Sequence, residues 1–315
     1  MIDNKVTVVI PTYNEEKTIK KLLDSLNDQT KKIDEIIISD NNSVDNTKNI
    51  VQTYIDNGFN IRLYERGGKC RGSGRNQGIN NSKNDLIALI DAGTYADKNW
   101  IKNLLINYNN KNTAIFGIVK ILFKNLFEHS IASSIVNKSK ENFTIEESVS
   151  SLLITKTIWR KIGKFPESKN GEYVVEDLIF IKRLKENCKV IYSNKAYVNW
   201  LIPNNIKQLF KRYIEYSEGG FRNGFIKKWH FGIIRNISII SIFLLLSFYN
   251  YLFIILIIIL IYLRSFFYLR RKLSFKSFSI IKKIKSILSI SVILILIDLA
   301  SIFGIIKYFL RKTIK

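Results

Sequence analysis

The chain has 315 residues and a formal net charge of +23 at pH 7, because 49 lysines and arginines outnumber 26 acids. A charge of this size favours anionic partners, and nucleic acid and acidic lipid both qualify. Two cysteines without a CxxC pair, together with two histidines, exclude a disulfide framework and a zinc site of the usual spacing.

The first 90 residues alternate between short apolar runs and stretches with helical periodicity. Strands are expected at 6–10, 36–39, 61–64 and 86–90. Between them we expect one helix capped by Asn14, one capped by Asp45, and one at about 73–81. Strands joined through helices form a parallel sheet, and α/β proteins bind ligands at the carboxyl ends of its strands. The sequence thus predicts an α/β fold with a Rossmann-like nucleotide-binding half.

The pattern loosens after Asp91. We expect helices near 99–107 and 177–185 and strands at 114–123, 151–155 and 189–192. The stretch between 123 and 150 has little periodicity. The sequence therefore predicts the nucleotide half in more detail than the half that would receive the sugar.

Charged residues near the ends of the predicted strands place Asp40, Arg75 and Asp91 at one edge of the sheet. The loop after the first strand reads PTYNEE, which excludes the GxGxxG of a Rossmann dehydrogenase, and no Walker A loop occurs. Two carboxylates there would repel a phosphate, so this loop suits a neutral base or ribose, with Tyr13 available to stack. The Gly-Arg loop that ends at Arg75 is better suited to diphosphate or base oxygens.

Several segments, in this order, resemble the inverting family 2 glycosyltransferases of the GT-A fold. VVIPTYNEE is similar to the opening strand and base-binding loop of that family, and SDNNSVDNT to its acidic turn. RGSGRNQGI resembles the loop before the fourth strand, and VVEDLIFIKRL resembles the Glu-Asp segment. QLFKRY is a looser form of the Gln-x-x-Arg-Trp element, with one extra residue and Tyr in place of Trp. The resemblance covers about residues 6–220, and it implies a hexosyltransferase-like enzyme.

The resemblance also implies roles for individual residues. Nucleotide binding is implied for Pro11, Thr12, Tyr13, Glu15, Asp40, Arg71 and Arg75. Catalysis is implied for Glu176 and Asp177, with Asp177 as general base, and contact with acceptor or diphosphate for Gln208, Arg212 and Tyr213. A simpler interpretation of Glu176 and Asp177 is that acids favour the first turn of a helix.

The metal element departs from the family pattern. The family usually carries Asp-x-Asp, whereas here the string is Asp91, Ala92 and Gly93, and glycine cannot be a ligand. One carboxylate can still hold Mg²⁺ or Mn²⁺ when substrate phosphates supply other oxygens. We therefore expect a divalent metal at Asp91 that the chain itself specifies weakly.

The last part of the chain reads as a membrane segment. After residue 228, 13 lysines and arginines accompany a single acid, Asp298, and the runs 236–263 and 286–306 are each long enough to cross a bilayer. We expect a cytoplasmic GT-A domain at 1–228 and a multi-pass cell-membrane domain at 229–315, with a basic loop at 264–285. The absence of a long apolar segment near Met1 predicts no cleaved signal peptide.

The membrane topology stays open because every boundary of the two apolar runs is basic. Two plain spans would place the basic segment between them outside, against the positive-inside rule. Two spans are favoured; a re-entrant hairpin bent near Tyr249 and Asn250, or an interfacial helix, is the alternative. Asp298 is expected to face the other helix and to pair with a basic group.

Together these features predict transfer of a sugar from a nucleotide-diphospho-sugar to a lipid-linked or glycan acceptor in cell-surface glycan synthesis, on a membrane with anionic lipid and without nucleic acid. A polyprenyl-phosphate glycosyltransferase is the first alternative, although such enzymes usually keep Asp-Ala-Asp. An inactive membrane-bound nucleotide-sugar sensor or scaffold is the second alternative, suggested by Gly93 alone. A processive synthase would need more spans.

Overall fold

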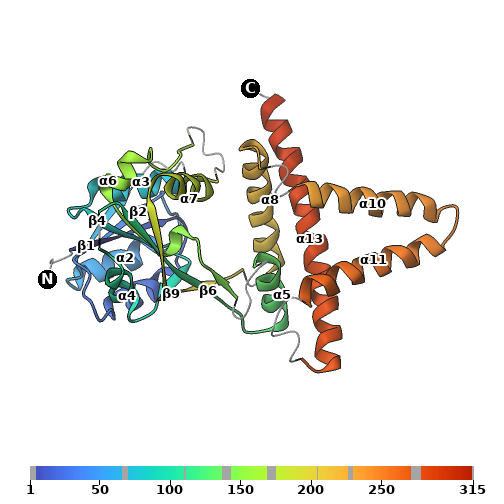
Figure 1. The fold of residues 1–315 in the computed structure, drawn as a ribbon, viewed down its shortest axis with the longest axis horizontal. Helices are drawn as coiled ribbons and strands as arrows, with labels where there is room; N and C mark the ends of the chain where they lie inside the picture. The colour runs from blue at the N-terminus through green and yellow to red at the C-terminus, as the bar shows by residue number, and fades with distance from the viewer. Residues whose placement is uncertain are drawn as a thin grey trace. The chain divides into compact units, whose positions relative to one another are not determined.

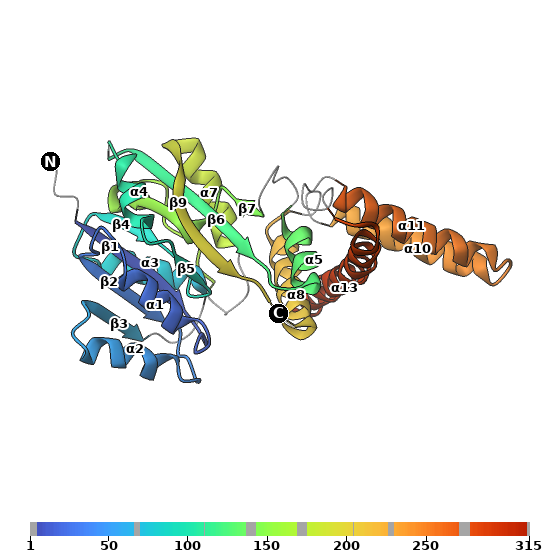
Figure 2. The ribbon, with the colours of Figure 1, turned by 90° about the horizontal axis from the view of Figure 1, so that it is seen from below.

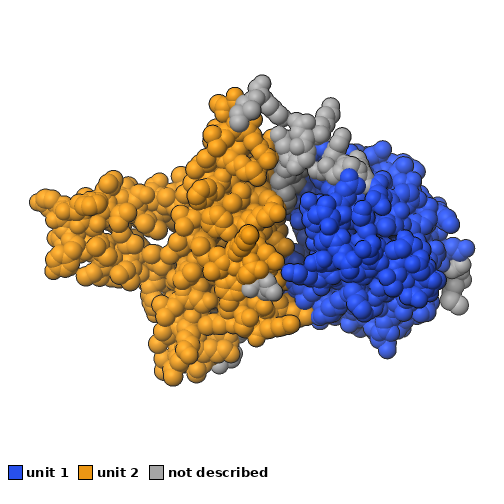
Figure 3. All heavy atoms as spheres, turned by 180° about the vertical axis from the view of Figure 1, so that it is seen from behind, with its two compact units in different colours: residues 1–121, 144–201 blue, residues 122–143, 202–315 orange. Residues whose placement is uncertain are grey.

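The structure is a computed structural model that describes residues 5–65, 70–109, 111–136, 143–168, 175–203, 205–225, 230–270 and 278–313. The chain forms two compact units (Figure 3). Unit 1 contains residues 1–121 and 144–201, and unit 2 contains residues 122–143 and 202–315. By compactness the chain divides after Leu201, and residues 122–143 belong with its C-terminal part.

Unit 1 consists of a nine-stranded sheet with helices (Figure 1). Its strands are β1 (Val6–Thr12), β2 (Glu35–Asp40), β3 (Ile61–Glu65), β4 (Leu86–Leu89), β5 (Thr94–Ala96), β6 (Thr113–Leu122), β7 (Thr144–Ile145), β8 (Leu152–Thr155) and β9 (Lys189–Leu201). Its helices are α1 (Ile19–Asn27), α2 (Thr47–Asp56), α3 (Arg71–Asn81), α4 (Trp100–Ile106), the 3₁₀ turn η1 (Val149–Ser151), α6 (Lys156–Lys161) and α7 (Glu176–Asn187). The order of the strands is β3-β2-β1-β4-β8-β6-β9-β5, with β7 beside β6.

The first four strands pair in parallel. β2 and β4 flank β1, and β3 lies outside β2, all in parallel register. Beyond β4 the pairs β4–β8, β6–β8, β6–β7 and β5–β9 are antiparallel. The expected α/β class is confirmed, but the sheet is mixed and not mostly parallel, since strands from the second half of the chain join it in antiparallel pairs.

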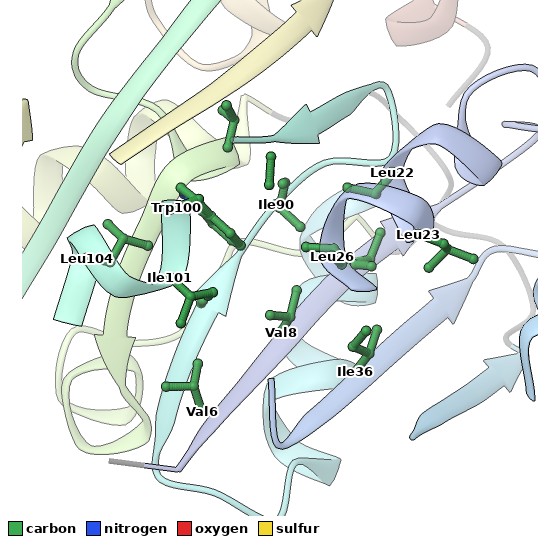
Figure 4. Close-up of a cluster of buried hydrophobic side chains, with 14 of the residues drawn as sticks. Val6, Val8, Leu22, Leu23, Leu26, Ile36, Ile90, Trp100, Ile101 and Leu104 are labelled. Atoms are coloured by element: carbon green, nitrogen blue, oxygen red, sulfur yellow. The ribbon is translucent and has the colours of Figure 1, made fainter. Parts of the chain in front are cut away.

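The helices cover the sheet through the apolar positions that the sequence pattern shows. In α1, Leu22, Leu23 and Leu26 are buried against β1 and its neighbours (Figure 4). Each fully buried leucine of this kind is worth about 1.5–3 kcal/mol. Asn14 does not cap α1: it has a positive φ of 53°, and its side-chain oxygen accepts a hydrogen bond from the Val44 backbone N–H (2.9 Å). Asn14 therefore ties the first loop to the loop after β2.

Unit 2 is helical. Its helices are α5 (Leu126–Ile135), α8 (Ile206–Arg222), α10 (Phe231–Ser247), α11 (Leu252–Leu269) and α13 (Ile280–Thr313). The first apolar run is not one helix. A turn at residues 248–251 divides it into α10 and α11, which lie side by side and antiparallel (Figures 1 and 2). The expected basic loop 264–285 is likewise largely helical in its described part, since α11 extends to Leu269 and α13 begins at Ile280.

Two helices, α11 and α13, are long and apolar enough to cross a membrane by length and composition. They are joined by an ion pair between Arg264 and Asp298, in which both guanidinium Nη atoms donate and one of the distances is 3.0 Å. The expected basic partner of Asp298 is thus Arg264. Along α13 also lie α8 and α5, so that α13 is the helix that holds unit 2 together.

Candidate active site

Three of the predicted site residues lie where neighbouring parallel strands end. Thr12 closes β1, Asp40 closes β2, and the two are paired in register. Asp91 follows β4, which lies on the other side of β1. Parallel strands end at one edge of a sheet, so the structure brings this part of the expected site together as predicted.

Arg75 is the centre of the site. It lies on α3 with a side chain that is only 1% exposed, and its guanidinium faces two acids. One Nη donates to Asp91 Oδ1 (2.7 Å) and the other donates to Glu176 Oε1 (2.9 Å). The Arg75 side chain thus joins Asp91, after β4, to Glu176 at the start of α7. Glu176 is 101 positions from Arg75 in the sequence. Arg75 binds acids here, a role that the expectation of a nucleotide contact did not include.

The three charges shift one another's pKa values. Burial alone would lower the pKa of Arg75, but the charges of Asp91 and Glu176 outweigh it and raise that pKa. Burial would raise the pKa of Asp91, yet Arg75 and the Ser150 hydroxyl lower it overall, so this carboxylate is ionised. Burial is the largest effect on Glu176, and the neighbouring Asp177 adds to it; the pKa of Glu176 is raised. The two acids that contact Arg75 thus have pKa values shifted in opposite directions, down for Asp91 and up for Glu176.

Close packing brings α3 near α7. A side chain at Gly72 would lie 2.2 Å from the Pro166 backbone oxygen and 3.2 Å from Glu176 Cγ, so only glycine fits there. Cys70 caps α3 through its Sγ, which accepts from the Ser73 backbone N–H (3.4 Å). Arg71, the first residue of the helix, is exposed and acts electrostatically on Asp91 and Glu176. The glycines of RGSGRNQGI therefore serve packing at least as much as ligand contact.

Asp177 is placed differently from Glu176. Both begin α7, where acids interact favourably with the helix dipole. Glu176 is buried against Arg75, whereas Asp177 is half-buried and its Oδ1 accepts from the Leu178 backbone N–H (2.8 Å). The ion pair with Arg75 accounts for Glu176 structurally, and Asp177 is the acid that remains accessible beside the site.

The first loop offers one exposed ring and one buried acid. Tyr13 is 56% exposed, as a stacking platform for a base would be. Asp40 is 1% exposed, and its two carboxylate oxygens accept from the Ser43 backbone N–H (2.7 Å) and hydroxyl (2.5 Å). Within the described part of the chain, the buried Thr12 hydroxyl has no hydrogen-bond partner. Pro11 precedes it, and Glu15 accepts from the Thr18 hydroxyl (2.5 Å).

The residues fit a divalent metal only through Asp91. Its Oδ1 accepts from Arg75 and its Oδ2 accepts from the Ser150 hydroxyl (2.6 Å). Among the described residues no three His, Cys, Asp or Glu side chains are grouped as metal ligands. A carboxylate has about four lone-pair sites, so Asp91 retains capacity for one metal bond. The remaining ligands would have to come from a bound diphosphate.

The three candidate residues of the QLFKRY element, Gln208, Arg212 and Tyr213, lie on α8 of unit 2. Gln208 is exposed, and Arg212 follows it one turn later on the same helix face. The extra residue in the spacing therefore keeps the two on one face. Tyr213 lies 3.5 Å from the Ser134 hydroxyl of α5, and burial raises the pKa of Tyr213.

Sequence reasoning missed two residues that shape the site. Ser150 lies in a stretch without periodicity, so nothing marked it as a partner of Asp91. Asn76, one position after Arg75, accepts from the Trp159 indole N–H (2.9 Å) and donates to the Phe165 backbone oxygen (2.9 Å). The Arg-Asn pair within RGSGRNQGI was the available signal for Asn76. It holds the 165–168 segment against α3.

The fold and the acid-lined strand edge define the GT-A type of nucleotide-sugar domain. Residues 7–160 match the family model described as Glycosyl transferase family 2. The chain therefore carries a Glycosyl transferase family 2 domain, and the resemblance to that family is confirmed over these residues.

Relatives and solved structures agree with this domain. The chain is 25% identical over 218 residues to "Glycosyltransferase GlyA" of Streptococcus pneumoniae, covering 62% of this chain and 30% of that protein. It is also 25% identical over 266 residues to a dolichyl N-acetyl-α-D-glucosaminyl phosphate 3-β-D-2,3-diacetamido-2,3-dideoxy-β-D-glucuronosyltransferase of Methanococcus voltae, covering 78% of this chain and 81% of that protein. The mannosyltransferase PcManGT of Pyrobaculum calidifontis, solved with GDP-Man and Mn²⁺, superposes with a TM-score of 0.51 at 16% identity over 70% of this chain and 64% of its own. The last likeness supports the fold alone.

Proposed function

We propose that the protein is an inverting glycosyltransferase that moves a sugar from a nucleotide-diphospho-sugar to a lipid-linked or glycan acceptor. The observation that carries this proposal is the placement of Asp177 beside the Asp91–Arg75–Glu176 cluster at the carboxyl edge of the sheet. That arrangement puts an accessible base next to a site for a charged leaving group. The chain spans less than a third of GlyA, so the whole-protein activity is inferred from the site and not from that relative.

The chemistry requires a base and a place for negative charge. Asp177 takes the proton of the acceptor hydroxyl. The acceptor oxygen then bonds to the anomeric carbon of the sugar on the face opposite to the diphosphate, and the bond between that carbon and the diphosphate breaks. One positioned base is worth about 10²–10⁴ in rate. Arg71 at the start of α3 and the backbone N–H groups of that helix end favour the departing diphosphate. A divalent metal, when bound, would neutralise the diphosphate further, and Asp91 is the residue that would hold it.

The donor nucleotide is proposed to lie over the first and second strand ends. Tyr13 would stack on the base, and Thr12 would offer its buried hydroxyl. Asp40 orders the adjacent turn through Ser43, so a direct contact between Asp40 and the base would require that turn to open. Glu15 and Pro11 shape the loop after β1. Arg75 sets the positions of Asp91 and Glu176.

A lipid-linked acceptor is favoured by two observations. The Methanococcus voltae relative is named for a dolichyl-phosphate-linked acceptor and matches over most of its length. Unit 2 exposes long apolar helices, which supports attachment to a membrane; the side is proposed to be the cytoplasmic one. In this arrangement Gln208, Arg212 and Tyr213 are proposed to meet the acceptor or the diphosphate. If the acceptor is a polyprenyl phosphate, its oxygen is already ionised, and Asp177 would position it.

The proposal is tested with the full chain in detergent, a panel of UDP-, GDP- and dTDP-sugars, native lipid extract and Mn²⁺. Release of nucleoside diphosphate that depends on one donor and on the lipid is the expected result. The anomeric configuration of the product, read by NMR, should be opposite to that of the donor. Saturable binding of one donor without release from any would favour the sensor.

A further inference from the structure

The α10–α11 hairpin exposes apolar side chains on all sides. None of the described side chains of α10 is buried, and in α11 only Ser265 and Leu269, near its end, are. Between them the two helices present exposed leucine, isoleucine and phenylalanine along their length. An exposed apolar surface of this extent is far larger than the patches that water-soluble proteins tolerate. Lipid or another protein surface must therefore cover the hairpin.

Charge marks one end of the hairpin as its base. Residues 236–263 contain no charged side chain, and the flanking arginines are Arg235 in α10 and Arg264 in α11. Because the helices are antiparallel, both arginines lie at the end away from the turn at 248–251. The turn itself carries aromatic side chains, with Tyr249 92% exposed. Arginine and lysine favour the cytoplasmic side of a membrane, and tyrosine favours a membrane–water interface, so both ends of the hairpin carry residues suited to an interface.

The length of the hairpin is compatible with deep insertion. Ser247 is twelve positions after Arg235, and Arg264 is twelve positions after Leu252. At 1.5 Å per residue each uncharged arm is about 18 Å long, to which the turn adds a few ångströms. The hydrocarbon core is about 30 Å thick, so the tip reaches the far leaflet while the arginines remain in the near interface.

The surroundings of α13 argue against its crossing the bilayer. Its covered face packs against α8, which carries six charged residues, and against α5. Ser130 of α5 donates to Ser289 (2.8 Å), and Ser217 of α8 donates to the Ser301 backbone oxygen (2.6 Å). A spanning α13 would carry α8 into the hydrocarbon, at about 2.5–3.5 kcal/mol for each central charge.

The opposite face of α13 is an apolar stripe. Its exposed large side chains recur every three or four residues: Ile281, Ile284, Leu288, Val292, Ile295, Leu299, Phe303, Ile306 and Leu310. Basic residues stand at both ends of the helix, Lys282, Lys283 and Lys285 at the first and Lys307, Arg311 and Lys312 at the second. A helix with an apolar stripe and cationic ends lies in a membrane interface.

We propose that unit 2 is a one-sided anchor for a bilayer with acidic headgroups. The α10–α11 hairpin inserts from the cytoplasmic leaflet with both ends on that side, and α13 lies in the plane of the same interface with its stripe toward the acyl chains. Figures 1 and 2 show the two hairpin helices together extending away from α13. This arrangement keeps every basic segment on one side, which two plain spans cannot do. Before residue 236 no uncharged run is longer than 11 residues, so unit 1 is on that side as well.

The first test measures sidedness. Single cysteines replace Lys182 of unit 1, Lys285 at the start of α13 and Lys312 at its end, in a full chain in which Cys70 and Cys188 are serine. All three should react with a membrane-impermeant maleimide in inside-out vesicles and none in right-side-out vesicles. Reaction of Lys285→Cys from the side opposite to Lys182→Cys would overturn the hairpin. Turnover is not needed, so the result is independent of the proposed sugar transfer.

The second test measures depth in vesicles of phosphatidylcholine and phosphatidylglycerol. Fluorophores on Leu288→Cys, Leu299→Cys and Leu310→Cys should all be quenched best by a shallow lipid quencher. A fluorophore on Leu256→Cys of α11 should be quenched best by a deep one, and one on Lys182→Cys by neither. Deep quenching confined to Leu299→Cys among the α13 positions would mean that α13 spans. Absence of quenching at Leu256→Cys would mean that a second copy covers the hairpin, and would also overturn the proposal.

Discussion

The two units bury charge in opposite senses. In unit 1 a buried cation, Arg75, lies between the acids Asp91 and Glu176, so the fully ionised cluster carries one negative charge. In unit 2 a buried acid, Glu218, lies among Arg222, Lys307 and Arg311, which leaves two positive charges. The first cluster suits a proton or a metal ion at a reaction site, and the second suits lipid phosphate. The sign of the excess charge thus distinguishes unit 1, with its candidate active site, from unit 2, the proposed anchor.

Removing the buried cation should have the largest effect on stability. Arg75→Met leaves two acids unpaired and should destabilise unit 1 by about 3–5 kcal/mol, as the loss of one partner in a buried ion pair does. Urea unfolding followed by the fluorescence of buried Trp100 and Trp159 measures it. The double variant Arg75→Met with Glu176→Gln should recover part of the loss. A single variant as stable as the parent chain would show that Arg75 does not hold the site.

The matching change in unit 2 should be smaller. Glu218→Gln removes the acid while its three cations keep some access to solvent, so the cost should be about 1–3 kcal/mol, the value of hydrogen bonds to charged groups. Hydrogen exchange in peptides of α8 and α13 should accelerate, and unit 1 peptides should be unaffected. Glu215→Gln on the same helix is the control. Equal exchange in both variants would remove the proposed role of Glu218.

A carboxylate at position 93, where the family usually has one, should strengthen metal binding in unit 1. A Cβ added at Gly93 would meet nothing within 4 Å, so the backbone there has room for the start of an Asp side chain. A second carboxylate should tighten Mn²⁺ binding in the presence of nucleoside diphosphate by on the order of tenfold, because ligand charge tunes the affinity for hard cations. Calorimetry measures this, and Gly93→Ala provides the neutral control. Unchanged affinity in Gly93→Asp would place the metal away from Asp91.

The smallest expected effect is a pH dependence. Burial raises the pKa of Asp91, but Arg75 and Ser150 outweigh it and lower the folded-state pKa below its value in the unfolded chain. Asp91 therefore stabilises the fold above about pH 4 and loses that contribution as pH falls through the lowered pKa. The gap in melting temperature between the parent chain and Asp91→Asn should be constant from pH 5 to 7 and shrink toward pH 3. A gap that widens on acidification would contradict the ion pair.

Local patterns in the sequence predicted the local parts of the structure. The β-branched runs located β1, β2 and β4, and the parallel pairing that follows from alternating helices brought Thr12, Asp40 and Asp91 to one edge. The contact between Arg75 and Glu176 spans 101 positions and leaves no periodic signal. The strands β6, β8 and β9 of the second half were located from the sequence, but their antiparallel pairing left no signal there, since long-range packing sets it.

Unit 2 shows a different limit to prediction from the sequence. Hydropathy cannot distinguish one apolar helix from two antiparallel ones, because both consist of the same residues. Asn250 and the tyrosines beside it were the available signal for the turn at 248–251. The partner of Asp298 could be predicted as a class, a basic group, but its identity as Arg264 depends on the fold.

The role of Asp177 is tested most directly by comparing Asp177→Asn with Glu186→Gln, a substitution of an exposed acid on the same helix. Turnover and donor affinity are measured for both in the full chain with the donor that the panel identifies. A fall in kcat by about 10²–10⁴ with unchanged donor affinity in Asp177→Asn, and parental values in Glu186→Gln, is the predicted result. Parental turnover in Asp177→Asn would contradict a transfer reaction that uses this acid as its base.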